Sequence, residues 1–228
     1  MRCPINKQTH AKNMAPQVRL LIHQPPVFES TSMFCLLTKE TREAILSLPR
    51  VHQRSVACLR FLQQISNPSL VSEEHKEIMR VAYLRAALME LVGMEEMLDY
   101  DLEERGQDET PLQIKDTECA MLILLRELRH LQLHLVTSTF SREPRDAVYR
   151  GGGEGEIATT ITINLIPLED LIKIKELKNA RRYNDHELDA AIEWLNQVQL
   201  NWGIADVLQR GVQKYADALV EEYHLLAT

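Results

Sequence analysis

The chain has 228 residues, a length that suits one large domain or one domain with an appendage. Its 8 glycines and its aromatic content of 5% disfavour a β-sandwich and favour helices. The net charge of -7 excludes a general attraction to nucleic acid or to anionic membranes, so a polyanion must bind at a local positive patch.

The 4 cysteines form no CxxC pair, and no apolar run reaches the roughly 20 residues that a membrane-spanning helix needs. Cys58 and Cys119 lie in apolar helical runs, as small buried hydrophobic residues do. Scattered thiols fit a reducing compartment, and the first residues lack the apolar core of a signal peptide. We therefore expect a cytoplasmic protein that does not engage a membrane.

Residues 1–33 contain several prolines and no helical period, so we expect an extended or disordered arm. Whether that arm belongs to the native protein stays open at this point. Four helices should follow it. They are expected at about 38–48 with Thr38 as N-cap, at 51–65 after Pro49, at 72–100, and at 117–139.

The second half of the chain has a different pattern. Residues 142–155 are rich in arginine and then in glycine, which predicts a loop. The β-branched run 157–166 predicts one strand that ends at Pro167. Helical stretches should then occupy about 168–179, 186–201 and 204–225, with Asp185 as an N-cap and Gly203 as a break.

These elements predict a mainly α protein with three parts. The arm of residues 1–33 precedes a helical bundle of four to five helices over residues 34–141. Residues 142–228 form a C-terminal extension, consisting of the loop, the short strand segment and helices, which should pack on the bundle.

The long helix that starts at Thr117 has two sides to bury. At 100° per residue, Leu124, Leu128 and Leu131 gather on one side as an ordinary core stripe. The opposite side mixes basic and apolar residues. It holds Arg126, Arg129, His130 and His134 together with Leu122, Ile123 and Leu133. We expect this second side to meet another helix, a tail segment or a second copy of the chain.

Two simpler interpretations of these basic residues remain open. The arginines could pair with acids on the same helix, at Glu118 or Glu127, as they do on many leucine-rich helices. His130 and His134 are four residues apart and could bind a metal. No third ligand is evident, because Glu127 should lie on a different part of the surface. We therefore expect no metal and no cofactor.

The run Arg129-His130-Leu131-Gln132-Leu133-His134 resembles the signature of the HEPN superfamily, small helical proteins that include many bacterial ribonuclease toxins and defence effectors. The family places a polar residue directly after the arginine, and His130 occupies that position here. The resemblance implies a HEPN-like bundle and metal-independent cleavage of RNA at a site made by two motif helices. It therefore implies a homodimer, and an antitoxin or regulatory protein as a further partner.

RNA cleavage by its own 2′-hydroxyl needs a base, an acid, and positive charge on the phosphorane. Under the resemblance, His134 would transfer protons, Arg129 would bind and stabilise the phosphate, and His130 would assist. Basic neighbours would extend the contact with substrate: Arg126, Arg142 and Arg145. An acid of the preceding helix, Glu90, Glu95 or Glu96, would hold Arg129 in place.

The alternative function is a catalytically silent helical module that uses the same helix only for dimerisation or for binding a partner protein. The acidic net charge favours this alternative, whereas the arginine and histidine motif favours the ribonuclease. The RNA target, the cleavage site and the activating signal are not readable from the sequence.

Overall fold

The computed structural model describes residues 37–66, 68, 72–134, 140–150 and 156–226. The arm predicted for residues 1–33 lies outside these ranges. The prediction of a mainly α protein is confirmed. The described helices are α1 (Lys39–Ile45), α2 (Pro49–Ser66), α3 (Glu73–Glu104), α4 (Ala120–His134), α5 (Leu168–Ile172), α6 (Asp185–Trp202) and α7 (Ile204–Glu222), with short 3-10 helices η1 (Ile114–Asp116), η2 (Lys173–Glu176) and η3 (Lys178–Arg182).

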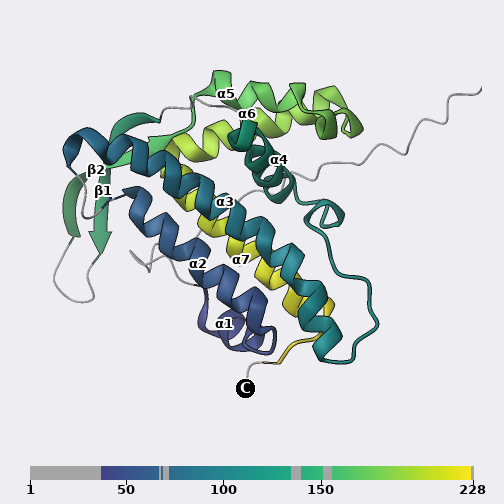
Figure 1. The fold of residues 1–228 in the computed structure, drawn as a ribbon. Coiled ribbons are helices and arrows are strands. Elements are labelled where there is room, and N and C mark those ends of the chain that lie inside the picture. Colours follow the sequence, from purple (N-terminus) through teal and green to yellow (C-terminus); the bar gives the residue numbers. More distant parts are fainter. Residues whose placement is uncertain (1–36, 67, 69–71, 135–139, 151–155, 227–228) are drawn as a thin grey trace, which may run out of the picture.

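A bundle of long helices forms the body of the molecule. Helices α2 and α3 run side by side, and α7 lies against both of them although it comes last in the chain (Figure 1). Helix α4 packs against α3, α6 and α7, while α1 packs against α2 and α7. One continuous apolar core joins these helices. Residues 142–228 thus supply α7 as a helix of the bundle itself.

The start of α1 was predicted correctly, and it is tied to α7. The Thr38 hydroxyl accepts a hydrogen bond from the Thr41 amide, as an N-cap does. Gln213 of α7 accepts from the Thr38 amide at 2.9 Å, and the Thr41 hydroxyl donates to Asp217 at 2.6 Å. These bonds satisfy polar groups that the packing of α1 on α7 takes out of water.

The loop predicted for residues 142–155 is wrong over its first part. Ser141–Arg150 forms β1, which pairs antiparallel with β2 (Glu156–Leu165) in a two-stranded sheet at one end of the bundle (Figure 1). The strand predicted from β-branched residues corresponds to β2. Charged residues and Pro144 concealed β1, because its pairing depends on β2 rather than on its own composition.

Other boundaries also differ from the prediction. Helix α4 begins at Ala120 rather than at Thr117, and α3 continues to Glu104. Asn184, not Asp185, caps α6, since its side chain accepts from the His186 amide at 2.9 Å. The stretch expected over 168–179 is divided into α5, η2 and η3. Gly203 separates α6 from α7 as predicted, with a φ of 81° that favours glycine.

Within the described part of the chain, none of the helices combines the length and the apolar character that crossing a membrane requires.

Gly211 marks the closest approach of α7 to α4. A Cβ atom at this position would lie 2.4 Å from Cδ1 of the buried Leu125. We expect Gly211→Ala to lower the free energy of unfolding by about 1–3 kcal/mol, because the core is overpacked. Urea titration monitored by circular dichroism measures this change.

Gly93→Ala is the matched control for this prediction. Gly93 also lies in a helix, but its Cβ would meet only the Arg54 side chain, at 3.4 Å. The alanine should raise stability by about 0.5–1 kcal/mol, since it reduces the entropy of the unfolded chain. Equal effects of the two substitutions would show that the contact of Gly211 with Leu125 is not tight.

Candidate functional site

The first half of α4 is largely buried. Its two sides each carry fully or nearly fully buried residues: Leu122, Ile123, Leu124, Leu125 and Leu128. The neighbours are helices of the same chain, namely α3, α6 and α7. The second apolar side expected for this helix is therefore covered, along its first half, by another helix of the chain. The last turns of α4 carry partly exposed polar residues, Arg129 and His130.

Arg126 is held inside the fold. Its guanidinium lies 3.7 Å from Glu95 of α3, and only 18% of its side chain is exposed. Glu95 also accepts a hydrogen bond at 2.8 Å from the amide of Ile114, at the start of η1. The carboxylate thus joins three segments, and Arg126 lies beside it with its Nε and Nη1 buried and without a hydrogen-bond partner among the described residues. The local pairing with Glu118 or Glu127 that the sequence left open for Arg126 is replaced by this interhelical ion pair.

Arg129, one turn later, lies at the surface. It is partly exposed, and its Nε donates to the thioether of Met89 on α3 at 3.3 Å. Sulfur is a weak acceptor, so most of the donor capacity of the guanidinium remains. Among the described residues Arg129 forms no ion pair with an acid. Its side chain is therefore able to bind an anion.

The two histidines follow Arg129 along the last turns of α4. His130 is partly exposed and follows Arg129 directly, and His134 is the last described residue of the helix. Residues four apart lie on the same side of an α-helix, so His130 and His134 share a side. The His134 side chain lies outside the described part of the structure. The backbone thus brings the three motif residues to one end of one helix.

The acids that were expected to support Arg129 do not pair with it among the described residues. Glu90 pairs with Arg54 of α2 at 3.0 Å, and Glu95 pairs with Arg126. Glu96 is exposed. Within the described residues, none of the three pairs with Arg129.

Arg142 and Arg145, which were expected in a loop, lie on β1. Arg142 is exposed. Arg145 donates from Nε to the Leu200 carbonyl of α6 at 3.0 Å and pairs with Glu143 at 2.6 Å. These bonds hold the hairpin against the end of α6, so Arg145 has a structural role in this conformation.

A buried polar cluster lies beside α4 that the sequence did not reveal. Glu127 was expected at the surface but is fully buried, and its nearest cation is Arg182 of η3, at 3.9 Å. Burial raises the pKa of the Glu127 carboxyl, although Arg182 and Arg126 oppose that shift. Burial also raises the pKa of Tyr183, whose hydroxyl has no hydrogen-bond partner among the described residues.

The raised pKa of Glu127 predicts a pH effect on stability. Between its ordinary value of 4.5 and the raised value, the folded chain binds a proton that the unfolded chain has lost. Stability therefore falls as pH rises through this window. Glu127→Gln removes this dependence, so the stability of the variant relative to the wild type should rise as pH increases above the ordinary value of 4.5. Urea unfolding of both proteins at each pH measures the difference.

A loss of stability in Glu127→Gln relative to the wild type as pH increases would contradict this prediction. It would show that Arg126 and Arg182 stabilise the ionised carboxylate by more than burial penalises it.

A metal centre finds no support in the described residues, where no three His, Cys, Asp or Glu side chains are placed to hold an ion together. Metal binding by His130 and His134 falls outside the described residues, because the side chain of His134 is not among them.

No known protein family, curated protein or solved structure matches this chain. The assignment of a function therefore depends on the geometry of the chain and on its sequence motif.

Proposed function

We propose that this chain is a metal-independent endoribonuclease of the HEPN type, a toxin or defence effector that acts through Arg129, His130 and His134. The observation that carries the proposal is the difference between two arginines of α4. Arg126 is largely buried and forms an ion pair with Glu95, whereas Arg129 is partly exposed and, among the described residues, hydrogen-bonds to the Met89 thioether and pairs with no acid. An arginine without a carboxylate partner, next to histidines, has the chemistry that a phosphodiester requires.

The reaction needs only groups that the end of α4 carries. A histidine removes the proton of the RNA 2′-hydroxyl, and the oxygen attacks phosphorus to form a cyclic phosphate. The bond to the 5′-oxygen breaks, and a second histidine returns a proton to that leaving group. Arg129 stabilises the charge on the equatorial oxygens of the phosphorane through its planar fork of donors.

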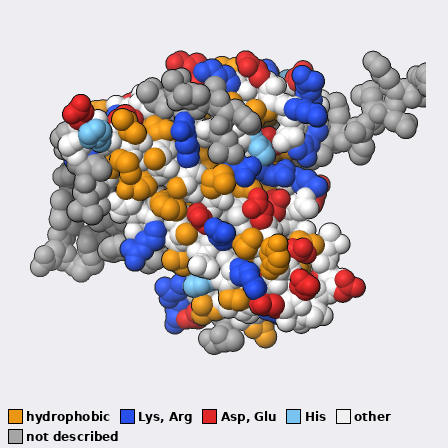
Figure 2. Space-filling model, viewed as in Figure 1, with side chains coloured by type: hydrophobic (Ala, Val, Ile, Leu, Met, Phe, Trp, Pro, Cys, Tyr) orange, Lys and Arg blue, Asp and Glu red, His pale blue; other side chains and the backbone are white. Residues whose placement is uncertain are grey.

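A homodimer would supply the acid and the base from two copies of α4. The surface beside Arg129 suits such an interface. Helix α3 exposes Ile78 at 66% and Met89 at 41%, and Met89 is the residue that Arg129 contacts. Figure 2 shows hydrophobic side chains gathered over α3 next to basic residues. Exposed apolar surface near a polar site is typical of a protein interface.

The second candidate is a silent module that uses this same surface only to dimerise or to bind a partner protein. The exposed apolar residues of α3 and the net charge of -7 favour it. Both candidate functions use a dimer through this surface, and they differ in whether the protein cleaves RNA.

The experiment that separates the two is RNA cleavage by the purified protein in EDTA. The ribonuclease should cut a labelled RNA pool, leave cyclic phosphate ends, and fail on a substrate whose 2′-hydroxyls are methylated. A folded and dimeric protein that leaves the RNA intact would favour the silent module. Cleavage that EDTA abolishes would overturn the metal-independent mechanism.

A further inference from the structure

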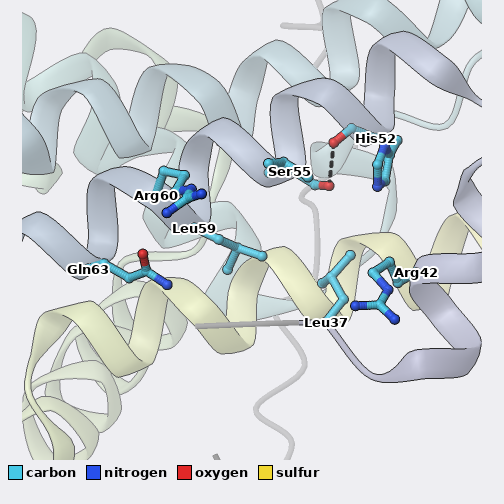
Figure 3. Close-up of a pocket in the computed structure, with 8 residues that line it drawn as sticks. Leu37, Arg42, His52, Ser55, Leu59, Arg60 and Gln63 are labelled. Carbon is cyan, nitrogen blue, oxygen red and sulfur yellow. Dashed lines mark hydrogen bonds between the residues drawn. The ribbon is translucent and has the colours of Figure 1, made fainter. Parts of the chain in front are cut away.

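A second site lies away from α4, between α1 and α2. A pocket of about 280 Å³ opens there (Figure 3). Its polar lining consists of Arg42, His52, Ser55, Arg60 and Gln63, and no carboxylate of the described residues takes part in it. Leu37, Val56 and Leu59 supply the apolar lining. A pocket with an apolar wall and a few convergent polar groups is the usual form of a small-molecule site.

The arginines of this pocket differ from the other arginines of the same region. Arg50 and Arg54 of α2 pair with Asp101 and Glu90 of α3. Arg42 and Arg60, by contrast, are exposed and pair with no acid among the described residues. Two guanidinium groups without acidic partners, in a chain of net charge -7, create a local positive potential that favours an anion.

His52 adds a polar group at the Arg42 end. Burial and then the nearby charge of Arg42 lower the pKa of His52, so the ring is neutral near pH 7. The Ser55 hydroxyl donates to the His52 carbonyl at 2.7 Å, which fixes this turn of α2 (Figure 3). The charge at this end of the pocket therefore comes from Arg42, and His52 can add a hydrogen bond.

The pocket has two cationic ends with an apolar middle. His52 and Arg60 are eight residues apart on α2, which places their backbones about 12 Å apart along the helix axis. Figure 3 shows Arg42 and Arg60 at opposite ends, with Leu37 and Leu59 between them. Val56, which is 42% exposed, belongs to the same apolar stretch.

We propose that this pocket binds an elongated small organic dianion, with one acidic group at Arg42, the other at Arg60, and an aliphatic body over Leu37 and Val56. The acidic groups are carboxylates or phosphates, since both accept the planar fork of arginine. This inference is independent of RNA cleavage, because it concerns residues of α1 and α2 that take no part in the proposed reaction.

Isothermal titration calorimetry with a series of eight-carbon probes tests the proposal. Octanedioate carries carboxylates at both ends, octanoate at one end, and octanediol at neither. We expect octanedioate to bind with one-to-one stoichiometry, octanoate about tenfold more weakly, and octanediol not at all. Octanediyl bisphosphonate distinguishes a phosphate ligand from a carboxylate ligand. If it binds more tightly than octanedioate, the ligand carries phosphates, and if it binds more weakly, the ligand carries carboxylates.

Arg42→Ala and Arg60→Ala should each weaken octanedioate binding by about tenfold or more, and Val56→Asp should abolish it. Arg181→Ala is the matched control, since Arg181 is an exposed arginine outside the pocket lining and its loss should leave binding unchanged. The proposal is overturned if neither dianion binds the wild type, if octanediol binds as well as octanedioate, or if the pocket variants bind like Arg181→Ala.

Discussion

Replacing Arg129 with alanine is expected to lower the rate of RNA cleavage by roughly 10²–10³-fold, the cost of removing one preorganised donor to a charged transition state. Stability should hardly change, because Arg129 is partly exposed and its only described hydrogen bond is to the Met89 thioether. Arg129→Lys keeps the charge but loses the fork of donors, and an intermediate rate is expected. Single-turnover cleavage of labelled RNA, together with thermal melting, measures both effects.

Under the proposed ribonuclease function, His134→Ala should lower the rate by roughly 10²–10⁴-fold, because the proposal assigns proton transfer to His134. The surviving activity should also lose one limb of its bell-shaped pH profile, which a merely structural residue would not change. Arg181→Ala, an exposed arginine of η3, is the matched control and should cleave at the wild-type rate. Full activity in both Arg129→Ala and His134→Ala would place the nuclease chemistry elsewhere or remove it altogether.

The sequence predicted the helical framework because its signals are local. A threonine at the start of α1, a proline at the start of α2, and a glycine between α6 and α7 each act within a few residues of their own position. Apolar periodicity likewise reports which side of a helix is buried. The mainly α fold follows from these signals alone.

The elements that were mispredicted depend on distant partners. Ser141–Arg150 has the composition of a loop and becomes a strand only through its register with β2. Pro144 is tolerated there because a two-stranded sheet leaves an edge where no backbone donor is needed.

The candidate site shows the same division. The sequence predicted that Arg129, His130 and His134 lie on one helix, because their spacing falls within one apolar helical run. The ion pair of Arg126 could not be predicted, because its partner Glu95 lies on α3, far away in sequence. Glu127 was expected at the surface for the same reason. Its described cationic neighbour at 3.9 Å, Arg182, belongs to η3, an element whose place in the fold no local pattern reveals.

Asp101 illustrates how strongly a distant residue can determine a local structure. Helix α2 begins at Pro49, and the residue before it is Leu48, which has no polar side chain to cap the helix. Asp101, near the end of α3, takes over this task. Its carboxylate accepts from the amides of Arg50 at 3.0 Å and Val51 at 2.9 Å, and from the Arg50 guanidinium at 3.1 Å.

Asp101→Ala is expected to lower the free energy of unfolding by about 3–5 kcal/mol, since it leaves two helix donors without a partner and removes the buried partner of the half-exposed Arg50. That is a large part of the roughly 5–15 kcal/mol that stabilises a typical domain, so a fall in melting temperature should be plain. Asp101→Asn keeps one acceptor oxygen and should lose about half as much. Urea titration followed by circular dichroism measures all three proteins.

Glu104→Ala tests whether Asp101 stabilises the fold by capping α2 or by pairing with Arg50, because Glu104 pairs with Arg50 without capping the helix. Glu104 pairs with the same arginine at 2.7 Å, but its side chain is 60% exposed and it accepts from no backbone amide of α2. Its loss should therefore leave stability almost unchanged. A similar destabilisation in Glu104→Ala and Asp101→Ala would mean that the ion pair with Arg50, rather than the cap, fixes α2 against α3. The large difference we expect instead follows from geometry: only Asp101 reaches the two amides that the first turn of α2 leaves without a partner.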